Sequence, residues 1–362
     1  MLPMSDLSIS GIGLVSPLGT DVADTWRRVQ AGERPPISQL RYGTSKRTFS
    51  VHTVPREFIR AYERHPRLRR SSEISHFATI AGMNAHQDAG LSEKTENVGV
   101  VFAISSGGVR YTTRFFQDVI STGAATASPL LFPETVFNAP ASHLAALLGI
   151  DGLSYTLVGD STIGLSALSF GADLLATGQL DHCLVVATEE VDWILCEAFR
   201  LSRYFTQAEA TRPFGGPHRR GTVFSEGAAA VVLSREGSVK LAAIHPGVPF
   251  FKKKAAETAL RTVLEELDMR PEIVFSNANG TTMDDAEKAA LDAVWPQIPT
   301  IAGKVSLGES VGAGALQQLV LAVQALREGQ FQSAGISAIG YNTLASGAIL
   351  QKTPASLPLG SP

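Results

Sequence analysis

Short apolar or β-branched segments alternate with longer helical patterns along this chain, and that alternation constrains its fold more than any other feature. Residues 7–15 have the composition of a buried strand, in which Gly11 and Gly13 mark a place where backbones approach closely. Residues 155–158 predict another strand, and an apolar helical stretch follows it at 162–176. Strands that alternate with helices in this way predict a layered α/β architecture.

The same alternation begins again in the second part of the chain. A predicted strand at residues 241–244 is followed by a helix at 255–267. The stretch 234–254 is therefore the one plausible internal boundary, and it divides the chain into residues 1–235 and residues 236–362. With 362 residues, of which 44% are hydrophobic, the chain has enough apolar material for a deep core.

Composition and charge exclude several classes of protein. The formal net charge of −3 gives no reason to expect nucleic acid or an anionic membrane surface as a partner. No run of apolar residues approaches the roughly 18 needed to cross a bilayer, and the N-terminus has no signal-peptide character. The two cysteines, Cys183 and Cys196, form neither a disulfide framework nor a metal cluster. We therefore expect a cytoplasmic protein without a bound metal.

Four segments of the chain carry a specific resemblance to a known family. They are ISGIGLVSPLGTDVADTWRRVQAGE, SPLLFPETVFNAPASHLAALLGIDGLSYTLVGDSTIGLSAL, RPFGGPHRRGTVFSEGAAAVVL and KVSLGESVGAGAL. In this order they resemble the first strand and helix, the approach to the nucleophile, the Arg-Pro-Phe stretch and the second histidine loop of the β-ketoacyl-acyl-carrier-protein synthases of the thiolase superfamily. Because these landmarks span nearly the whole chain in the family's order, the match is specific.

This resemblance implies a fold and a chemistry. The fold is a thiolase-like five-layer α/β/α/β/α sandwich built from two similar halves, and the molecule is a dimer. The acyl chain arrives on the phosphopantetheine arm of an acyl carrier protein, and no cofactor is bound. In this family a cysteine at a helix N-terminus, where the thiolate is favoured, accepts the acyl group. Two histidines help to decarboxylate the malonyl unit and stabilise the developing enolate.

At these three catalytic positions the chain carries other side chains. The cysteine position falls on Ser161 in Gly-Asp-Ser-Thr-Ile-Gly, and the first histidine position falls on Asn279 in Asn-Ala-Asn-Gly-Thr. The second histidine position falls on Glu309. Lys304 and Gly308, which precede Glu309, match the family and are assigned a supporting role.

The three replacements remove what condensation requires. A serine hydroxyl is far less acidic than a thiol, and a helix dipole supplies only about 0.3–2 kcal/mol where one pKa unit costs about 1.4 kcal/mol. Asn279 is able to donate a hydrogen bond to an oxyanion, but it cannot shuttle protons. An ionised Glu309 repels the charge that condensation creates, and pairing with Lys304 is a more favoured role for it than catalysis.

The resemblance also assigns supporting residues outside these loops. The family's C-terminal gate, usually Gly-Phe-Gly-Gly-Thr-Asn, is reduced here to Gly-Tyr-Asn-Thr, so that Tyr341 and Asn342 occupy substrate-binding or supporting positions. Residues 115–137 correspond to the dimer interface and the tunnel floor of the family, and Phe137 lies at the end of this region.

Three functions fit this pattern. The leading hypothesis is a non-condensing subunit that resembles the chain length factors of type II polyketide systems, including those that make aryl polyenes. Such a subunit pairs with an active ketosynthase, works with an acyl carrier protein and helps to shape the acyl tunnel. The second is an acyltransferase or thioesterase that uses Ser161 as nucleophile, Glu309 as base and Asn279 as oxyanion donor. The third is a non-enzymatic homodimer that binds acyl chains or carrier proteins.

Overall fold

The computed structural model describes residues 7–41, 47–91, 97–202, 210–215, 221–341 and 343–354. In the large sheet, the strands of the first part are β1 (Ser8–Val15), β4 (Val98–Ile104), β5 (Ser154–Val158), β6 (His182–Glu189) and β8 (Gly227–Ser234). Those of the second part are β9 (Val239–Pro249), β10 (Ile273–Ser276), β11 (Thr300–Ile301), β12 (Ser333–Ile339) and β13 (Leu344–Lys352). A small separate sheet consists of β2 (Ser38–Arg41), β3 (Thr48–His52) and β7 (Phe224–Ser225).

Helices connect most of these strands. In the first part they are α1 (Val22–Gln30), α2 (Arg56–Glu63), α3 (Glu73–Asp88), α4 (Val109–Thr122), η2 (Phe132–Thr135), α5 (Ala139–Leu148), α6 (Ile163–Ala176) and α7 (Trp193–Leu201). In the second part they are η4 (Lys253–Ala255), α8 (Ala256–Glu266), α9 (Met283–Val294), α10 (Lys304–Leu307) and α11 (Val311–Arg327). Within the described ranges, no helix has both the length and the apolar character that a membrane crossing requires.

The two sets of strands share one topology. The first set is ordered β5-β4-β6-β8-β1 across the sheet, and the second is ordered β11-β10-β12-β13-β9. In both sets the chain visits these positions in the same sequence: it starts at the last position, then takes the second, the first, the third and the fourth. In both sets the first two pairings are parallel and the last two are antiparallel. A short antiparallel contact between β1 and β9 joins the sets into one ten-stranded sheet. The two similar halves are thus present, while the division into domains 1–235 and 236–362 stays a prediction.

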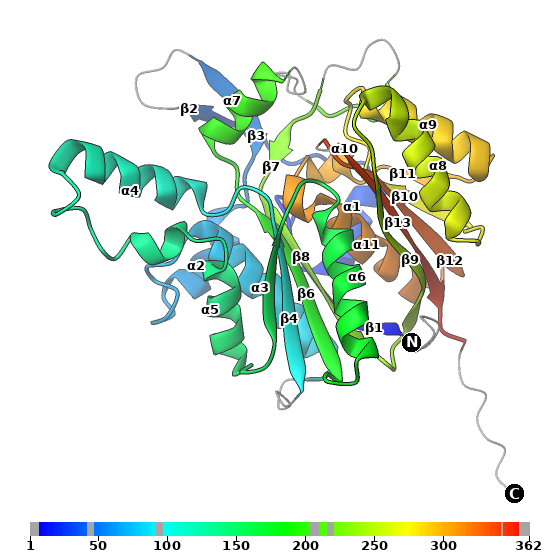
Figure 1. Ribbon diagram of the computed structural model, residues 1–362, viewed down its shortest axis with the longest axis horizontal. Helices are drawn as coiled ribbons and strands as arrows, with labels where there is room; N and C mark the ends of the chain where they lie inside the picture. The colour runs from blue at the N-terminus through cyan, green and yellow to red at the C-terminus, as the bar shows by residue number, and fades with distance from the viewer. Residues whose placement is uncertain are drawn as a thin grey trace, which may run out of the picture.

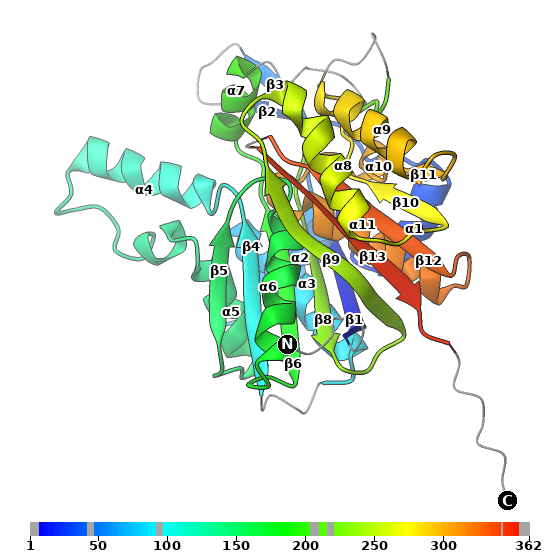
Figure 2. The ribbon, with the colours of Figure 1, turned by 45° about the vertical axis from the view of Figure 1, so that its right-hand side comes forward.

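Helices separate and cover the two sets of strands (Figures 1 and 2). Helix α3 covers the outer face of the first set together with α5, and α8 and α9 cover the outer face of the second. Helices α6 and α11 lie between the sets and contact strands of both. The order of layers is therefore α/β/α/β/α, which confirms the thiolase-like sandwich expected from the sequence.

The composition of the central helices explains why they are enclosed. All residues of α11 from Val311 to Leu326 are buried except Gln324, and most of them are apolar, although Gln317 and Gln318 are also enclosed. A helix with apolar residues around most of its circumference is stable inside a core, because that surface must be removed from water. In the outer layer, α3 packs directly on the backbone of β1. This contact requires a glycine, because a Cβ atom at Gly13 would lie 2.0 Å from the carbonyl oxygen of Ala81. The close approach expected at Gly13 is confirmed.

Helix α4 extends away from the body of the molecule (Figure 1). A partly buried charge network fixes its base. The Arg110 side chain pairs with Glu73 and with the buried Glu226, and it also donates to the carbonyl oxygen of Val191 at 2.8 Å. The backbone N–H of Arg110 donates to Glu190 at 2.9 Å. Burial raises the pKa of Glu190 to about 8, although the neighbouring Arg110 guanidinium opposes this shift.

The raised pKa of Glu190 predicts a specific dependence of stability on pH. A carboxyl group with a pKa near 8 when folded and an ordinary value when unfolded binds more protons in the folded state, so its contribution to the free energy of unfolding falls as the pH rises from about 4.5 to about 8. Glu190→Gln cannot ionise, and its stability relative to the unmodified protein should therefore improve across that interval. Urea unfolding at pH 5, 6, 7 and 8 measures this difference, and a difference that is constant with pH contradicts the assignment.

Candidate functional site

The three positions predicted to match the family's catalytic residues come from three separate loops. Ser161 lies between β5 and α6, Asn279 between β10 and α9, and Glu309 between α10 and α11. Their exposed fractions are 1%, 5% and 0%, so all three side chains are inside the protein. The first loop belongs to one half of the fold and the other two belong to the second half.

Two asparagines join these loops. The Nδ2 atom of Asn277 donates to the carbonyl oxygen of Ser161 at 3.2 Å, and its backbone N–H bonds to Ser337 on β12 at 2.9 Å. Two residues later, Nδ2 of Asn279 donates to Oε2 of Glu309. The structure therefore brings the serine, asparagine and glutamate loops into one continuous cluster across the two halves.

Glu309 is the centre of this cluster. Its Oε2 atom accepts from Lys304 Nζ at 2.6 Å and from the hydroxyl of Tyr341 at 3.1 Å, in addition to Asn279. Both members of the ion pair have fully buried side chains. The backbone of Glu309 is held as well, since its N–H bonds to Val223 and its carbonyl accepts from Ser225, both at 2.9 Å. The pairing with Lys304 that the sequence favoured is present.

The surroundings of the pair admit no larger side chains. Gly308 has a φ of +77°, and a Cβ atom there would lie 2.6 Å from the Cβ of Ser225. A Cβ atom at Gly314 would lie 3.0 Å from Lys304 Nζ. These glycines let the loop turn and let α11 pass beside the ion pair, which gives a packing reason for the glycine-rich motif.

Tyr341 closes one side of the cluster. Its ring packs edge-on against Phe199, with ring centroids 5.0 Å apart. Burial and the adjacent Glu309 carboxylate raise the pKa of Tyr341 well above its ordinary value. The phenol is therefore a neutral donor at every physiological pH. Asn342, its predicted companion, lies outside the described residues.

Within the described part of the chain, Ser161 Oγ is not hydrogen-bonded to a base. Among the described residues, none forms a hydrogen bond with Ser161 Oγ. An activated serine needs an oriented base within hydrogen-bond reach, and the Glu309 carboxylate instead binds Lys304.

The predicted supporting residue Phe137 lies outside the cluster. Its side chain is 44% exposed and faces Gly107.

Two buried carboxylates behind the cluster were missed from the sequence. Asp284 accepts from the backbone N–H groups of Asn279 and Gly280 at 3.0 and 2.9 Å, and it thereby shapes the asparagine loop. Glu287 accepts from Ser276 Oγ at 2.6 Å, and burial raises its pKa to about 7. The available signal was their i, i+3 spacing, which places both on one face of α9.

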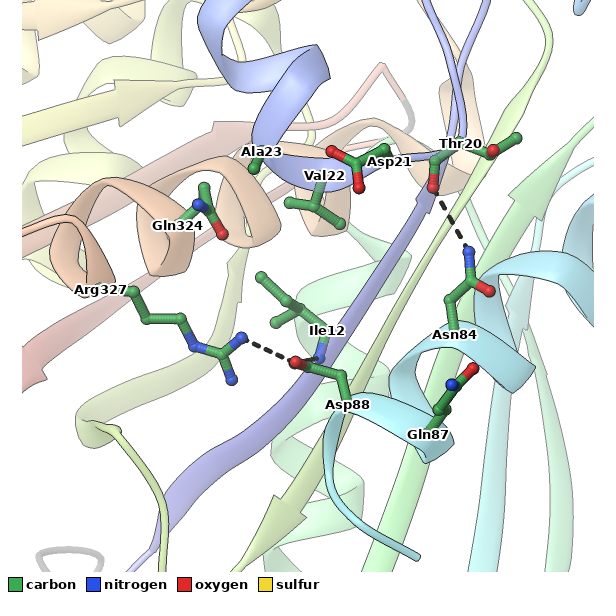
Figure 3. A pocket seen from close by; sticks show the side chains of 10 residues that line it. All are labelled: Ile12, Thr20, Asp21, Val22, Ala23, Asn84, Gln87, Asp88, Gln324 and Arg327. Atoms are coloured by element: carbon green, nitrogen blue, oxygen red, sulfur yellow. Dashed lines mark hydrogen bonds and ion pairs between the residues drawn. The ribbon is translucent and has the colours of Figure 1, made fainter. Parts of the chain in front are cut away.

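A separate groove of about 690 Å3 contains none of these positions (Figure 3). It lies between the start of α1 and the ends of α3 and α11. Asp88 holds it together, because it accepts from the N–H of Ile12 at 2.8 Å and pairs with Arg327 at 2.6 Å. The groove and the buried cluster are therefore different parts of the molecule.

The energetics of the buried pair lead to a prediction. Lys304→Met leaves the Glu309 carboxylate without its cation and should lower the free energy of unfolding by about 3–5 kcal/mol. Replacing both members, as in Lys304→Met with Glu309→Leu, removes both charges and should recover more than half of that loss. Urea unfolding of the single and double variants measures both values. If the double variant is no more stable than the single one, the pair is not the dominant interaction here.

The chain is similar to known proteins over most of its length. Residues 4–238 match the family model described as the N-terminal domain of β-ketoacyl synthase. The 3-oxoacyl-[acyl-carrier-protein] synthase 2 of Coxiella burnetii is 24% identical over 354 residues, which cover 88% of this chain and 85% of that protein.

Solved structures show the same fold over nearly the whole length of the chain. The ishigamide ketosynthase/chain length factor matches with a TM-score of 0.79 and 18% identity, covering 96% of this chain and 99% of that one. A type II polyketide acyl carrier protein in complex with its ketosynthase matches with a TM-score of 0.80 and 16% identity, again covering 96% and 99%. The family model covers more than half of the chain, and the protein belongs to the β-ketoacyl synthase family.

Proposed function

We propose that this chain is the non-condensing subunit of a β-ketoacyl synthase pair, of the chain length factor type. It forms a heterodimer with an active ketosynthase in type II polyketide or fatty-acid-like chain elongation, and it helps to shape the acyl tunnel. One observation carries the proposal: the carboxylate at the second histidine position is locked in a buried pair with Lys304, while Ser161 has no base among the described residues.

The chemistry of condensation explains why this observation matters. An acyl-enzyme requires a nucleophile that ionises near neutral pH, and a serine hydroxyl does so only with a base. Loss of carbon dioxide from a malonyl thioester places negative charge on the thioester oxygen, which needs hydrogen-bond donors around it. Here the donors Lys304 and Asn279 are already bound to Glu309. The preserved scaffold therefore favours a role in which the surface of the chain binds a partner and its interior shapes the acyl tunnel.

The surface available for a partner is apolar and lies on one side of the first half. Strand β5 is at the end of the sheet, and its Tyr155 and Val158 side chains are exposed. The neighbouring α4 and η2 segments expose further large apolar side chains: Phe116, Ile120, Leu130, Phe132, Val136 and Phe137. An edge strand beside an apolar patch of this kind is a site for association with another chain. This surface includes the region that the resemblance assigns to the dimer interface.

A second surface suits an acidic carrier protein. Five arginines follow one another on and after α2, and all are exposed: Arg60, Arg64, Arg67, Arg69 and Arg70. Arg56, at the start of the same helix, is instead engaged by Glu63 and Glu73. In a protein with a net charge of −3, this local excess of positive charge steers an anionic partner to one place. We propose that an acyl carrier protein, with its phosphopantetheine arm, docks there. The sequence has another basic run, His218-Arg219-Arg220, which lies outside the described part of the chain.

The heterodimer is tested by co-expression with an active ketosynthase of the same organism and by mass measurement of the purified complex. We expect an equimolar complex. Ile120→Asp places a charge in the apolar patch and should weaken association at least about 30-fold. Phe251→Asp is the matched control, because Phe251 is 93% exposed but belongs to the second half of the fold. A lone chain that forms a stable homodimer and ignores the ketosynthase would overturn the proposal.

The serine-dependent acyltransferase or thioesterase makes a different prediction. It requires an acyl group on Ser161, whereas the absence of a bonded base among the described residues leads us to expect no adduct. Incubation with an acyl-carrier-protein thioester, followed by intact-mass analysis, separates the two functions. An adduct that appears in the unmodified chain and disappears in Ser161→Ala would favour the enzyme.

A further inference from the structure

Three hydrogen-bond donors converge on a single oxygen atom in the buried cluster. They are the ammonium of Lys304, the amide of Asn279 and the hydroxyl of Tyr341, and all are directed at Oε2 of Glu309. The donors come from α10, from the loop after β10 and from the segment between β12 and β13. Three donors from three elements around one oxygen form an anion-binding site, with one full positive charge among them.

The Glu309 carboxylate is bound through only one of its two oxygen atoms, Oε2, by the described residues. Among the described residues, none forms a hydrogen bond with its second oxygen, Oε1. That atom lies instead beside the backbone of α11, where a Cβ atom at Gly314 would be 3.2 Å away. The backbone of Glu309 is fixed independently by Val223 and Ser225. The loop thus keeps its course through backbone bonds, while the side chain alone fills the site.

We propose that the former catalytic centre is an oxyanion-binding site which Glu309 occupies in cis, and that a small carboxylate binds there once this side chain is shortened. The significance of this anion site for the cell rests on the function proposed above, the non-condensing subunit of a ketosynthase pair. A subunit that fills its own anion site does not compete with its ketosynthase partner for an anionic extender unit. The ligand class is a monocarboxylate that matches the part of the side chain that is removed.

The size of the ligand follows from the chemistry of the substitution. Glu309→Ala removes a CH2 group and a carboxylate, which together have the shape of acetate. Acetate has the same heavy atoms as the part that is removed, formate lacks its methyl group, and propionate has one carbon atom more than that part. Well-packed interiors respond to a single extra methylene, so these three anions should differ in effect.

A purely structural ion pair behaves differently. In that case water enters the vacated space and solvates the Lys304 side chain once its partner is removed. The variant then has no need of an anion, and added carboxylates act on it no more than chloride does. The two explanations are separated by the response to the free anion.

The test is thermal denaturation of the full-length Glu309→Ala variant in increasing sodium acetate, against sodium chloride at equal ionic strength. We expect a saturable rise in Tm of about 2–5 °C with acetate, a smaller rise with formate and none with propionate. Glu309→Gln, which keeps the side-chain volume, is the matched control and should respond to no anion. The double variant Lys304→Met with Glu309→Ala lacks the cation and should also give no response.

Equal melting of Glu309→Ala in acetate and chloride overturns the proposal, and so does an equal acetate response of Glu309→Gln. If Glu309→Ala does not fold unaided, its refolding yield in acetate and in chloride is the measurement, and equal yields, zero included, overturn the proposal too. The unmodified chain tests the heterodimer separately. A failure of the anion site and a failure of the proposed function are therefore distinguishable.

Discussion

The buried pair of Lys304 and Glu309 is the interaction around which the rest of the site is organised. Removing two charges from water costs several kcal/mol for each ion, and their attraction offsets this cost only when the geometry is good and the other polar atoms are bonded. That condition explains the contacts around the pair. Asn279 and Tyr341 supply further donors, and Gly308 and Gly314 allow the backbone to come close. The pair thus constrains segments that lie far apart in the sequence.

The repeated topology determines where this pair is placed. Each half contributes strands in the same order and direction, and the apolar helices α6 and α11 separate the two sets. Helix α11 begins directly after the Glu309 loop, and α6 begins directly after Ser161. The beginnings of the two central helices and the loop after β10 therefore meet inside the protein. A site at this junction requires both halves, and this is why the bond from Asn277 to the Ser161 loop matters.

Much of this arrangement follows from the sequence, and the part that does not has a physical reason. The apolar composition of residues 7–15 and 162–176 predicts β1 and α6, because burial and chain periodicity are local properties. The three positions assigned to catalysis rest on the resemblance to family motifs and stay a prediction. The pairing of Glu309 with Lys304 was favoured from the sequence, but only the structure shows it. The i, i+3 spacing of Asp284 and Glu287 places both on one face of α9, but the spacing alone does not show that this face is buried. An acidic residue near the start of a helix is usually explained by the helix dipole. The bond between Glu287 and Ser337 joins residues 50 positions apart, so no local pattern in the sequence indicates it.

The same limit applies to Arg110, whose partners Glu73 and Glu226 lie on opposite sides of it in the sequence. Its network fixes the base of α4, and α4 carries part of the apolar surface proposed for the ketosynthase. The positions predicted to match the family's catalytic residues carry Ser161, Asn279 and Glu309. The charges that hold α4 are partly buried and paired, and Lys304 and Glu309 are fully buried and paired. Unpaired buried charges are costly, so neither network persists unless its geometry is maintained. In this chain the polar interior supports a shape, and the function proposed for it depends on that shape.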